Sequence, residues 1–281
     1  MMKEKAMEEE TMKEVITLYD FYGIWLVHVK GEIDPVSWRT MPHSHEHHEL
    51  FVHLSGEMEI YAENNMYHLS GGEVRFYSAG ELHGGLLKSR SAEWFQICLP
   101  PSFNDFADAK ALTLLFTERT FGIGNVFVSK RHNEIVRLLS EIFACYKNDT
   151  LLRSAFCKSA LIRILCLLGD PAERIERERH HIEVLNELIE IVNAHFDTIE
   201  TVGDLCELAH YSTSYISRLF RENLDISPYQ FLLGKKLNEA KNALRSGKNV
   251  MEAAELAGFR NYSNFITLFR KKFGVTPHKY K

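Results

Sequence analysis

The 281-residue sequence has no uninterrupted apolar run of the roughly 18 residues that a membrane-spanning helix needs. Its first residues, MMKEKAMEEETMKE, are charged and lack the apolar core and small-residue cleavage site of a signal peptide. The five cysteines are scattered and form no CxxC pair, which is typical of reduced thiols. We therefore expect a cytoplasmic protein with no membrane association.

The chain also lacks the short motifs of several enzyme classes. It contains no GxSxG nucleophile turn, no P-loop and no GxGxxG phosphate loop; Gly122-Ile123-Gly124 lacks the third glycine and follows no clean strand. The composition, 45% hydrophobic, 25% charged and 11% aromatic, is ordinary for a soluble globular protein and excludes collagenous or wholly disordered chains. The length favours two domains.

Charge is distributed unevenly along the sequence. The net charge is −5, but residues 230–281 carry 11 Lys and Arg against 3 Asp and Glu. Residues 182–229 carry 2 against 9. A basic block at one end is what a phosphate-binding surface requires, although a solvated helix face has the same composition.

The N-terminal half is rich in short segments of aromatic and β-branched residues separated by Gly, Asn and Ser. The segments predicted as strands are FYGIWLVHV (21–29), ELFVHL (49–54), EMEIYA (57–62), MYHL (66–69), EVRFY (73–77) and EWFQICL (93–99). Their close spacing predicts a small antiparallel β-barrel or sandwich over residues 15–128, after a disordered tail at 1–14.

The apolar period then changes from strand-like to helical. Residues 130–147 and 151–168 each predict a helix, and the second is apolar on more than one face. Burial of several faces suggests contact with the barrel and with a second subunit, so residues 129–170 are a predicted dimerisation segment. Gly169-Asp170-Pro171 ends the second helix, and the charged residues 171–181 are the predicted linker to an all-α domain at 182–281.

An internal repeat is the strongest feature of the C-terminal part. The first copy reads VGDLCELAHY followed by ISRLFRENLDISPYQF, and the second reads VMEAAELAGF followed by ITLFRKKFGVTPHKY. Both copies contain a short capped helix, a tight turn and a second helix ending in LFR, which predicts helix-turn-helix motifs at about 201–223 and 249–272. Thr201 with Asp204, and Asn249 with Glu252, are the predicted capping pairs. The predicted core of the first motif is Val202, Leu205, Leu208, Ile216, Leu219 and Phe220.

The last hundred residues, which contain this repeat, resemble the AraC/XylS family of bacterial transcription regulators. The specific match is AGFRNYSNFITLFRKKFGVTPHKYK at Ala257–Lys281. The resemblance implies two motifs bridged by a long helix at about Pro228–Arg245, binding of double-stranded promoter DNA, transcriptional activation, a homodimer and contact with RNA polymerase.

In such a domain the second helix of each motif enters the major groove. Arg218 is the best candidate for a bidentate guanine contact, and Thr267 stands where the family often has Arg. We interpret Ile216, Phe220, Phe265 and Phe269 as core. The predicted DNA-contacting residues are Ser214, Tyr215, Ser217, Arg218, Arg221, Ser263, Asn264, Thr267, Arg270, Lys271 and Lys272.

A histidine cluster marks the N-terminal half. His43-x-His45-x3-Glu49-x6-Gly56 resembles the first cupin motif, and Gly72-x7-Gly80-x2-His83 resembles most of the second. Ser78 and Leu87 depart from the second pattern, where cupins usually have Pro and Asn. His47, His48, His53 and His68 we interpret as exposed or turn residues. The resemblance implies a cupin or jelly-roll-like barrel in an α+β multidomain protein.

The cluster has two interpretations. His43, His45, Glu49 and His83 could bind a divalent transition metal such as Zn, Mn, Fe or Ni, or they could contact an effector without metal, which we favour. Trp25 and Trp38 are further candidate effector contacts, and Phe51, Tyr61, Phe76 and Trp94 could line the same cavity. A carbohydrate is the first choice of effector, before bile-acid-like, aromatic or peptide ligands. The alternative functions are a metal sensor and a cupin metalloenzyme, but fusion to a DNA-binding domain favours sensing without catalysis.

Overall fold

The structure is a computed structural model that describes residues 11–35, 39–63, 65–147, 152–176 and 183–280. The chain divides into two compact units, of which the second contains residues 40–44, 82–85 and the described residues from 183 onward. The first unit consists mainly of strands and the second mainly of helices. Among the described residues, no helix is both long and apolar enough to cross a membrane.

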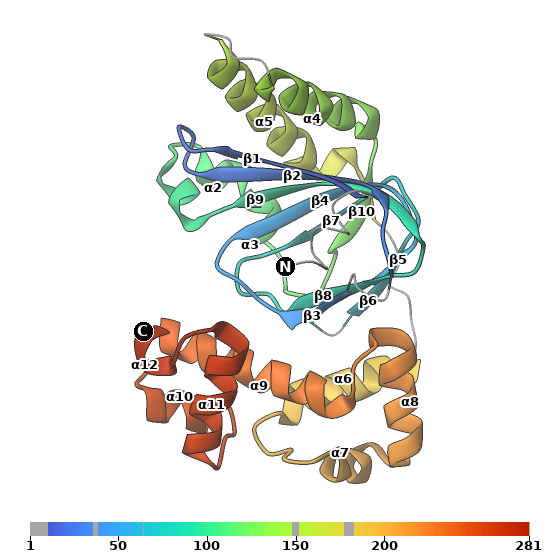
Figure 1. The fold of residues 1–281 in the computed structure, drawn as a ribbon, viewed down its shortest axis with the longest axis vertical. Coiled ribbons are helices and arrows are strands. Elements are labelled where there is room, and N and C mark those ends of the chain that lie inside the picture. Colours follow the sequence, from blue (N-terminus) through green and yellow to red (C-terminus); the bar gives the residue numbers. More distant parts are fainter. Residues whose placement is uncertain (1–10, 36–38, 64, 148–151, 177–182, 281) are drawn as a thin grey trace. The chain divides into compact units, whose positions relative to one another are not determined.

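The strands of the N-terminal part form two β-sheets (Figure 1). The seven-stranded sheet has the order β1 (Thr11–Leu18), β2 (Ile24–Glu32), β9 (Ser91–Leu99), β4 (His48–Ser55), β7 (Glu73–Tyr77), β10 (Val126–Ser129) and β11 (Arg174–Glu176). Its neighbouring strands all pair antiparallel. The four-stranded sheet has the order β3 (Arg39–His43), β8 (His83–Leu87), β5 (Met58–Ala62) and β6 (Asn65–Leu69).

The seven-stranded sheet is buried on both faces because its strands alternate between two apolar sets. Leu50 pairs with Phe76 and Ile97, and these side chains belong to an outer core. The next residue, Phe51, belongs to an inner core shared with Met58, Ile60, Tyr67 and Leu69 of the four-stranded sheet. The two sheets therefore pack face to face, which confirms the predicted antiparallel β architecture.

Helices cover the outer face of the seven-stranded sheet (Figure 1). The main ones, α4 (His132–Tyr146) and α5 (Arg153–Gly169), pack against each other, and α4 buries Ile135, Leu139 and Ile142 at its predicted spacing. The shorter elements are η1 (Pro101–Asp105), α2 (Ala109–Leu112), α3 (Leu114–Thr117) and η2 (Pro171–Glu173).

Three features of this unit differ from the sequence-based expectations. β1 begins at Thr11, so residues 11–14 belong to a strand and not to the predicted tail, of which residues 1–10 lie outside the described part. Residues 174–176 of the predicted linker form β11, which pairs with β10. Strands β3, β8 and β10 were also not expected. Each of these segments is short or carries charged residues, and long-range pairing makes it a strand where local composition does not.

The C-terminal unit consists of helices (Figure 1). They are α6 (Glu183–His195), α7 (Val202–Ala209), α8 (Thr213–Leu224), α9 (Pro228–Arg245), α10 (Val250–Leu256), α11 (Tyr262–Phe273) and α12 (Pro277–Tyr280). The predicted capping pairs at α7 and α10 both form complete capping boxes. Ser227 and Gln230 form a third at α9, the predicted bridging helix.

Each helix-turn-helix motif has its own small core. Ile216 and Phe220 of α8, and Phe265 and Phe269 of α11, are fully buried as predicted. Leu208 was expected in the core but is 46% exposed. Leu208 follows the helical spacing of the apolar residues in α7. However, α7 is short, and the neighbouring helices cover only one narrow face of it.

Candidate functional site

The second helix of the first motif, α8, separates its apolar and polar faces. Ser214, Arg218 and Arg221 are exposed on the face opposite the core, and Tyr215 and Ser217 are half-buried beside them. The Arg218 guanidinium carbon lies 5.4 Å from the centroid of the Tyr215 ring. This cation–π contact orients the side chain outward from the helix.

In the second motif, α11 presents the corresponding residues. Ser263, Asn264, Thr267, Arg270, Lys271 and Lys272 are all exposed. Thr267 donates a hydrogen bond from Oγ1 to the carbonyl oxygen of Ser263 at 3.0 Å. Its short side chain is thus turned back along the helix, whereas the exposed Arg218 side chain contacts the ring of Tyr215. The two exposed faces therefore offer different groups to a ligand, a hydroxyl on α11 and a guanidinium on α8.

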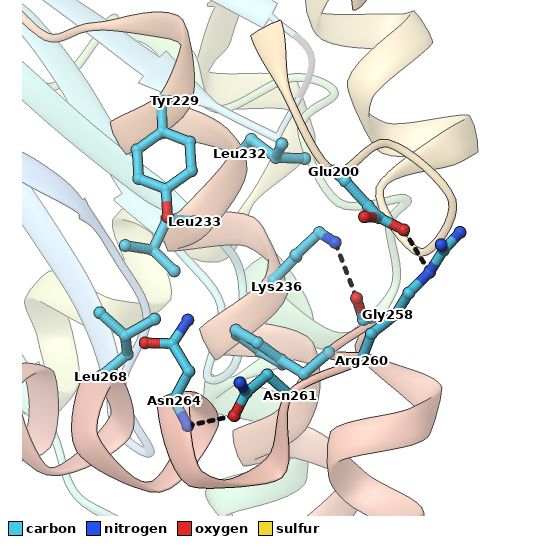
Figure 2. Close-up of a pocket in the computed structure, with 11 residues that line it drawn as sticks. Glu200, Tyr229, Leu232, Leu233, Lys236, Gly258, Arg260, Asn261, Asn264 and Leu268 are labelled. Carbon is cyan, nitrogen blue, oxygen red and sulfur yellow. Dashed lines mark hydrogen bonds and ion pairs between the residues drawn. The ribbon is translucent and has the colours of Figure 1, made fainter. Parts of the chain in front are cut away.

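A pocket of ≈ 180 Å³ separates α9 from the start of α11 (Figure 2). Lys236 donates from Nζ to the carbonyl oxygen of Gly258 at 2.9 Å, and Arg260 forms an ion pair with Glu200. Glu200 precedes the first motif and Arg260 lies in the turn of the second, so the pair joins the two repeats. Lys236 and Arg260 were not predicted as site residues. The signals in the sequence were a lysine in the middle of the bridging helix and an arginine in the turn of the second motif.

β3 and β8 bring two residues of the predicted histidine cluster together. The rings of His43 and His83 have centroids 4.5 Å apart. His83 is buried and His43 is half-buried. Two imidazoles this close can contribute to binding one divalent transition metal.

Glu49 belongs to a second group and does not complete the first. A ring nitrogen of His45, one of His47 and a carboxylate oxygen of Glu49 lie within 4.8 Å of one another. Glu49 accepts a hydrogen bond from Nε2 of Gln96 at 3.0 Å, and Nε2 of His47 lies 3.1 Å from the same oxygen. Two of the four expected ligands, His45 and Glu49, therefore lie in this group. His47, interpreted as an exposed or turn residue, lies in the bend before β4 and contacts the same carboxylate.

The orientation of His45 suits a ligand. Its Nδ1 lies 2.9 Å from the carbonyl oxygen of His47, and because a carbonyl only accepts, Nδ1 must carry the proton. Nε2 then faces Oε2 of Glu49 at 3.1 Å. A divalent cation bound between Nε2 and Oε2 would accept a lone pair from each of these atoms.

Of the aromatic candidates, Trp25 lies next to the histidines. It is half-buried, and its ring centroid is 4.7 Å from that of His47. Phe51 and Trp94 belong to the inner core between the sheets, whereas Phe76 faces the outer core and cannot line the same cavity. Trp38 lies outside the described residues.

Two further histidines are more enclosed than expected. His53 is fully buried, its Nε2 lies 2.7 Å from the carbonyl oxygen of Gly56, and burial lowers its pKa to about 4. His48 stacks on Phe116, and burial lowers its pKa to about 4 as well. The alternating pattern of β4 alone could not reveal that both of its faces are covered.

The sequence analysis also missed Arg75, which lies in the middle of β7. Its side chain is 3% exposed and shares the inner face of the sheet with its strand neighbour Phe51. The signal in the sequence was a positively charged residue between the apolar residues Val74 and Phe76 of the predicted strand EVRFY.

Comparison with known proteins agrees with this arrangement. Residues 31–165 match the AraC-like ligand binding domain family, and residues 205–281 match a helix-turn-helix domain family. The probable transcriptional regulator LumQ of Photobacterium leiognathi is 24% identical over 242 residues, which are 85% of this chain and 91% of that protein. The raffinose operon transcriptional regulatory protein RafR of Pediococcus pentosaceus is 25% identical over 147 residues, 51% of this chain and 53% of that protein.

Among solved structures, the C-terminal domain of the two-component response regulator yesN from Fusobacterium nucleatum is 31% identical to the chain. The match covers 34% of this chain and 93% of that domain, with a TM-score of 0.32. The two family matches fall on the two units of the fold, one on the paired sheets and one on the tandem motifs. The chain therefore belongs to the AraC family of transcriptional regulators, with an N-terminal ligand-binding domain and a helix-turn-helix DNA-binding domain.

Proposed function

We propose that this regulator is an activator that responds to a carbohydrate bound beside the histidine cluster of the N-terminal domain. His43, His45, Glu49 and His83 supply hydrogen-bonding groups, and Trp25 supplies an aromatic face. Aromatic faces with a few polar groups suit sugar rings. The relative from Pediococcus pentosaceus, named for a raffinose operon, supports the choice of carbohydrate.

The observation that supports the proposed DNA contacts is the exposed polar and basic face on both α8 and α11. Ser214, Ser217 and Arg218, with Ser263, Asn264 and Thr267, are proposed to contact base edges. Tyr215, Arg221, Arg270, Lys271 and Lys272 are proposed to contact the phosphate backbone. The exposed guanidinium of Arg218 is proposed to make the first motif the main source of sequence discrimination.

The protein would act in the cytoplasm as a homodimer that contacts RNA polymerase. Residues 129–170 are the proposed dimerisation segment, and exposed Leu152 and Phe156, at the start of α5, support this assignment. Effector binding would change which DNA half-sites the dimer occupies together. The size of this shift is set by the difference between the effector's affinities for the two conformations of the dimer.

The direct test is the affinity of the full chain for its operator after Arg218→Ala. We expect a loss of about 1–3 kcal/mol of discrimination against a guanine substitution in the first half-site. Arg90→Ala, an exposed arginine of the N-terminal domain, is the matched control and should leave binding unchanged. Equal discrimination in Arg218→Ala and in the parent would refute the role given to Arg218.

The geometry of the histidines favours a second candidate, a metal-responsive regulator. His45, His47 and Glu49 each place one ligand atom within 4.8 Å of the other two, and the ring of His45 is oriented by a carbonyl as metal ligands usually are. Elemental analysis of protein purified without chelator should find one equivalent of Zn, Mn, Fe or Ni that is lost in His45→Ala. A metal content near zero in the parent would refute this candidate.

A further inference from the structure

Arg75 is a buried cation at the centre of the ligand-binding domain. It pairs with Phe51 of β4 on one side and with Val126 of β10 on the other, so its side chain points between the two sheets. Nη1 reaches Sδ of Met58, which belongs to β5 of the opposite sheet, at 2.6 Å. The guanidinium therefore lies in the interior between the two sheets.

The contacts of Arg75 are weak for a guanidinium with five N–H donors. Its central carbon lies 4.1 Å from the centroid of the Phe51 ring, and its other contact is the thioether of Met58. Nε is buried and has no hydrogen-bond partner in the described part of the chain. No ion pair joins Arg75 to a carboxylate among the described residues.

Glu49 and Glu73 are the acidic residues nearest to Arg75 in the register, and both are engaged elsewhere. Glu73, two residues before Arg75 on β7, accepts hydrogen bonds from the backbone nitrogens of Gly71 at 2.7 Å and Ser70 at 3.3 Å. Glu49 pairs with Tyr77, two residues along β7 from Arg75, a diagonal separation of about 7–8 Å between backbones. Its carboxylate oxygens contact Gln96, His45 and His47 at 3.0–3.1 Å. His53, also on this face, is neutral at pH 7 because burial lowers its pKa to about 4. The positive charge of Arg75 is thus not neutralised by a contact.

A buried charge without a partner is costly, and proteins retain one where it serves a ligand. A planar carboxylate or a phosphate matches the guanidinium in charge and in hydrogen-bond geometry. We propose that the effector carries a carboxylate or phosphate group that binds Arg75, so that the ligand is an acidic or phosphorylated sugar. This inference rests on the proposed function, namely a carbohydrate effector bound in the N-terminal domain.

The test uses the full chain with three probes, glucuronate, glucose 6-phosphate and neutral glucose, each measured by thermal shift and calorimetry. Either anionic probe should raise the melting temperature of the parent more than glucose does, and the responding probe identifies carboxylate or phosphate. Arg75→Met should weaken that binding by at least about 30-fold, and Arg75→Lys by less because it keeps the charge. Arg90→Met is the matched control and should bind as the parent does.

The melting temperature of the ligand-free protein provides a second test. Because methionine removes an unpaired buried charge, Arg75→Met should raise the melting temperature by about 2–8 °C. A lower melting temperature in Arg75→Met would overturn the inference, since Arg75 would then stabilise the fold itself. Binding of the anionic probe that is equal in the parent and in Arg75→Met would also overturn it while leaving the carbohydrate function intact. If none of the three probes binds, the proposed carbohydrate function is refuted. The change in melting temperature of ligand-free Arg75→Met, upward or downward, then still decides whether Arg75 serves a ligand or stabilises the fold.

Discussion

Lys236 and Gly258 are joined by a hydrogen bond of 2.9 Å between Nζ and the carbonyl oxygen, which ties the bridging helix α9 to the turn of the second motif. Lys236 also lies 5.8 Å from the centroid of the Phe259 ring, and burial lowers the pKa of its ammonium group. The ion pair between Glu200 and Arg260 lies beside this contact (Figure 2). These contacts fix the spacing of α8 and α11, which must match successive segments of the major groove.

The first prediction concerns Gly258, which has a φ of +71°. A Cβ at this position would overlap the backbone of Asp197, so Gly258→Ala must both strain the turn and separate the two repeats. We expect a loss of about 2–4 kcal/mol in the free energy of unfolding, measured by urea denaturation of the full chain.

Gly247 is the matched control, because it has a φ of +90° and no atom within 4 Å of an added Cβ. Gly247→Ala should cost about 1–2 kcal/mol from strain alone. If both alanine variants lose the same stability, the close approach of Gly258 to Asp197 has no energetic role.

The second prediction concerns the capping box of α10. The Asn249 side chain accepts hydrogen bonds from the backbone of Met251 and Glu252, and Glu252 accepts one from the backbone of Asn249. Asn249→Ala should destabilise the chain by about 1 kcal/mol, whereas Asn249→Asp should change stability by only a few tenths. The midpoint of urea unfolding measures both. A loss in Asn249→Asp as large as that in Asn249→Ala would show that the cap does not act through its side-chain oxygen.

The third prediction separates phosphate contacts from base contacts. Arg270 is exposed in the last turn of α11, away from the N-terminal residues that would face base edges. Arg270→Ala should weaken binding to all DNA sequences alike and reduce the salt slope of log K by about 1. Fluorescence anisotropy with an operator and a scrambled duplex over a salt series gives both values. A loss confined to the operator would instead make Arg270 a base-reading residue.

The fourth prediction concerns the pH dependence of stability through His53. Because burial lowers the folded-state pKa to about 4, the folded protein favours the neutral imidazole. This contribution to stability is complete above the unfolded-state pKa of about 6.5 and is lost progressively as the pH falls toward 4. The single group corresponds to roughly 2–4 kcal/mol over that range.

His53→Gln tests this directly, because the amide can still donate to the carbonyl of Gly56 but does not titrate in this range. Its free energy of unfolding should fall less steeply than that of the parent between pH 6.5 and pH 4. His48, whose pKa is also lowered to about 4, contributes a remaining slope of the same sign. Identical pH profiles in the parent and in His53→Gln would contradict the prediction.

The histidine cluster shows how far a linear motif can be trusted. The spacing of His43 and His83 predicted a shared site, and their rings do lie together. The motif also assigned His45 and Glu49 to that site; these two side chains contact each other, and Glu49 also contacts His47 and Gln96. Spacing specifies which face of a strand a residue occupies, whereas the partner on that face depends on the register between strands.

The sequence by itself determined the tandem motifs, their capped starts and the polar faces of α8 and α11. These features depend on contacts within a few residues along the chain, such as Ser227 with Gln230, and local periodicity reports them directly. Tertiary structure alone decided that β11 joins the sheet, that His53 is buried and that Arg75 lies between two sheets without a carboxylate partner. Each of these depends on pairing between segments distant in sequence, because burial of both faces of a strand is settled only when the second layer packs against it.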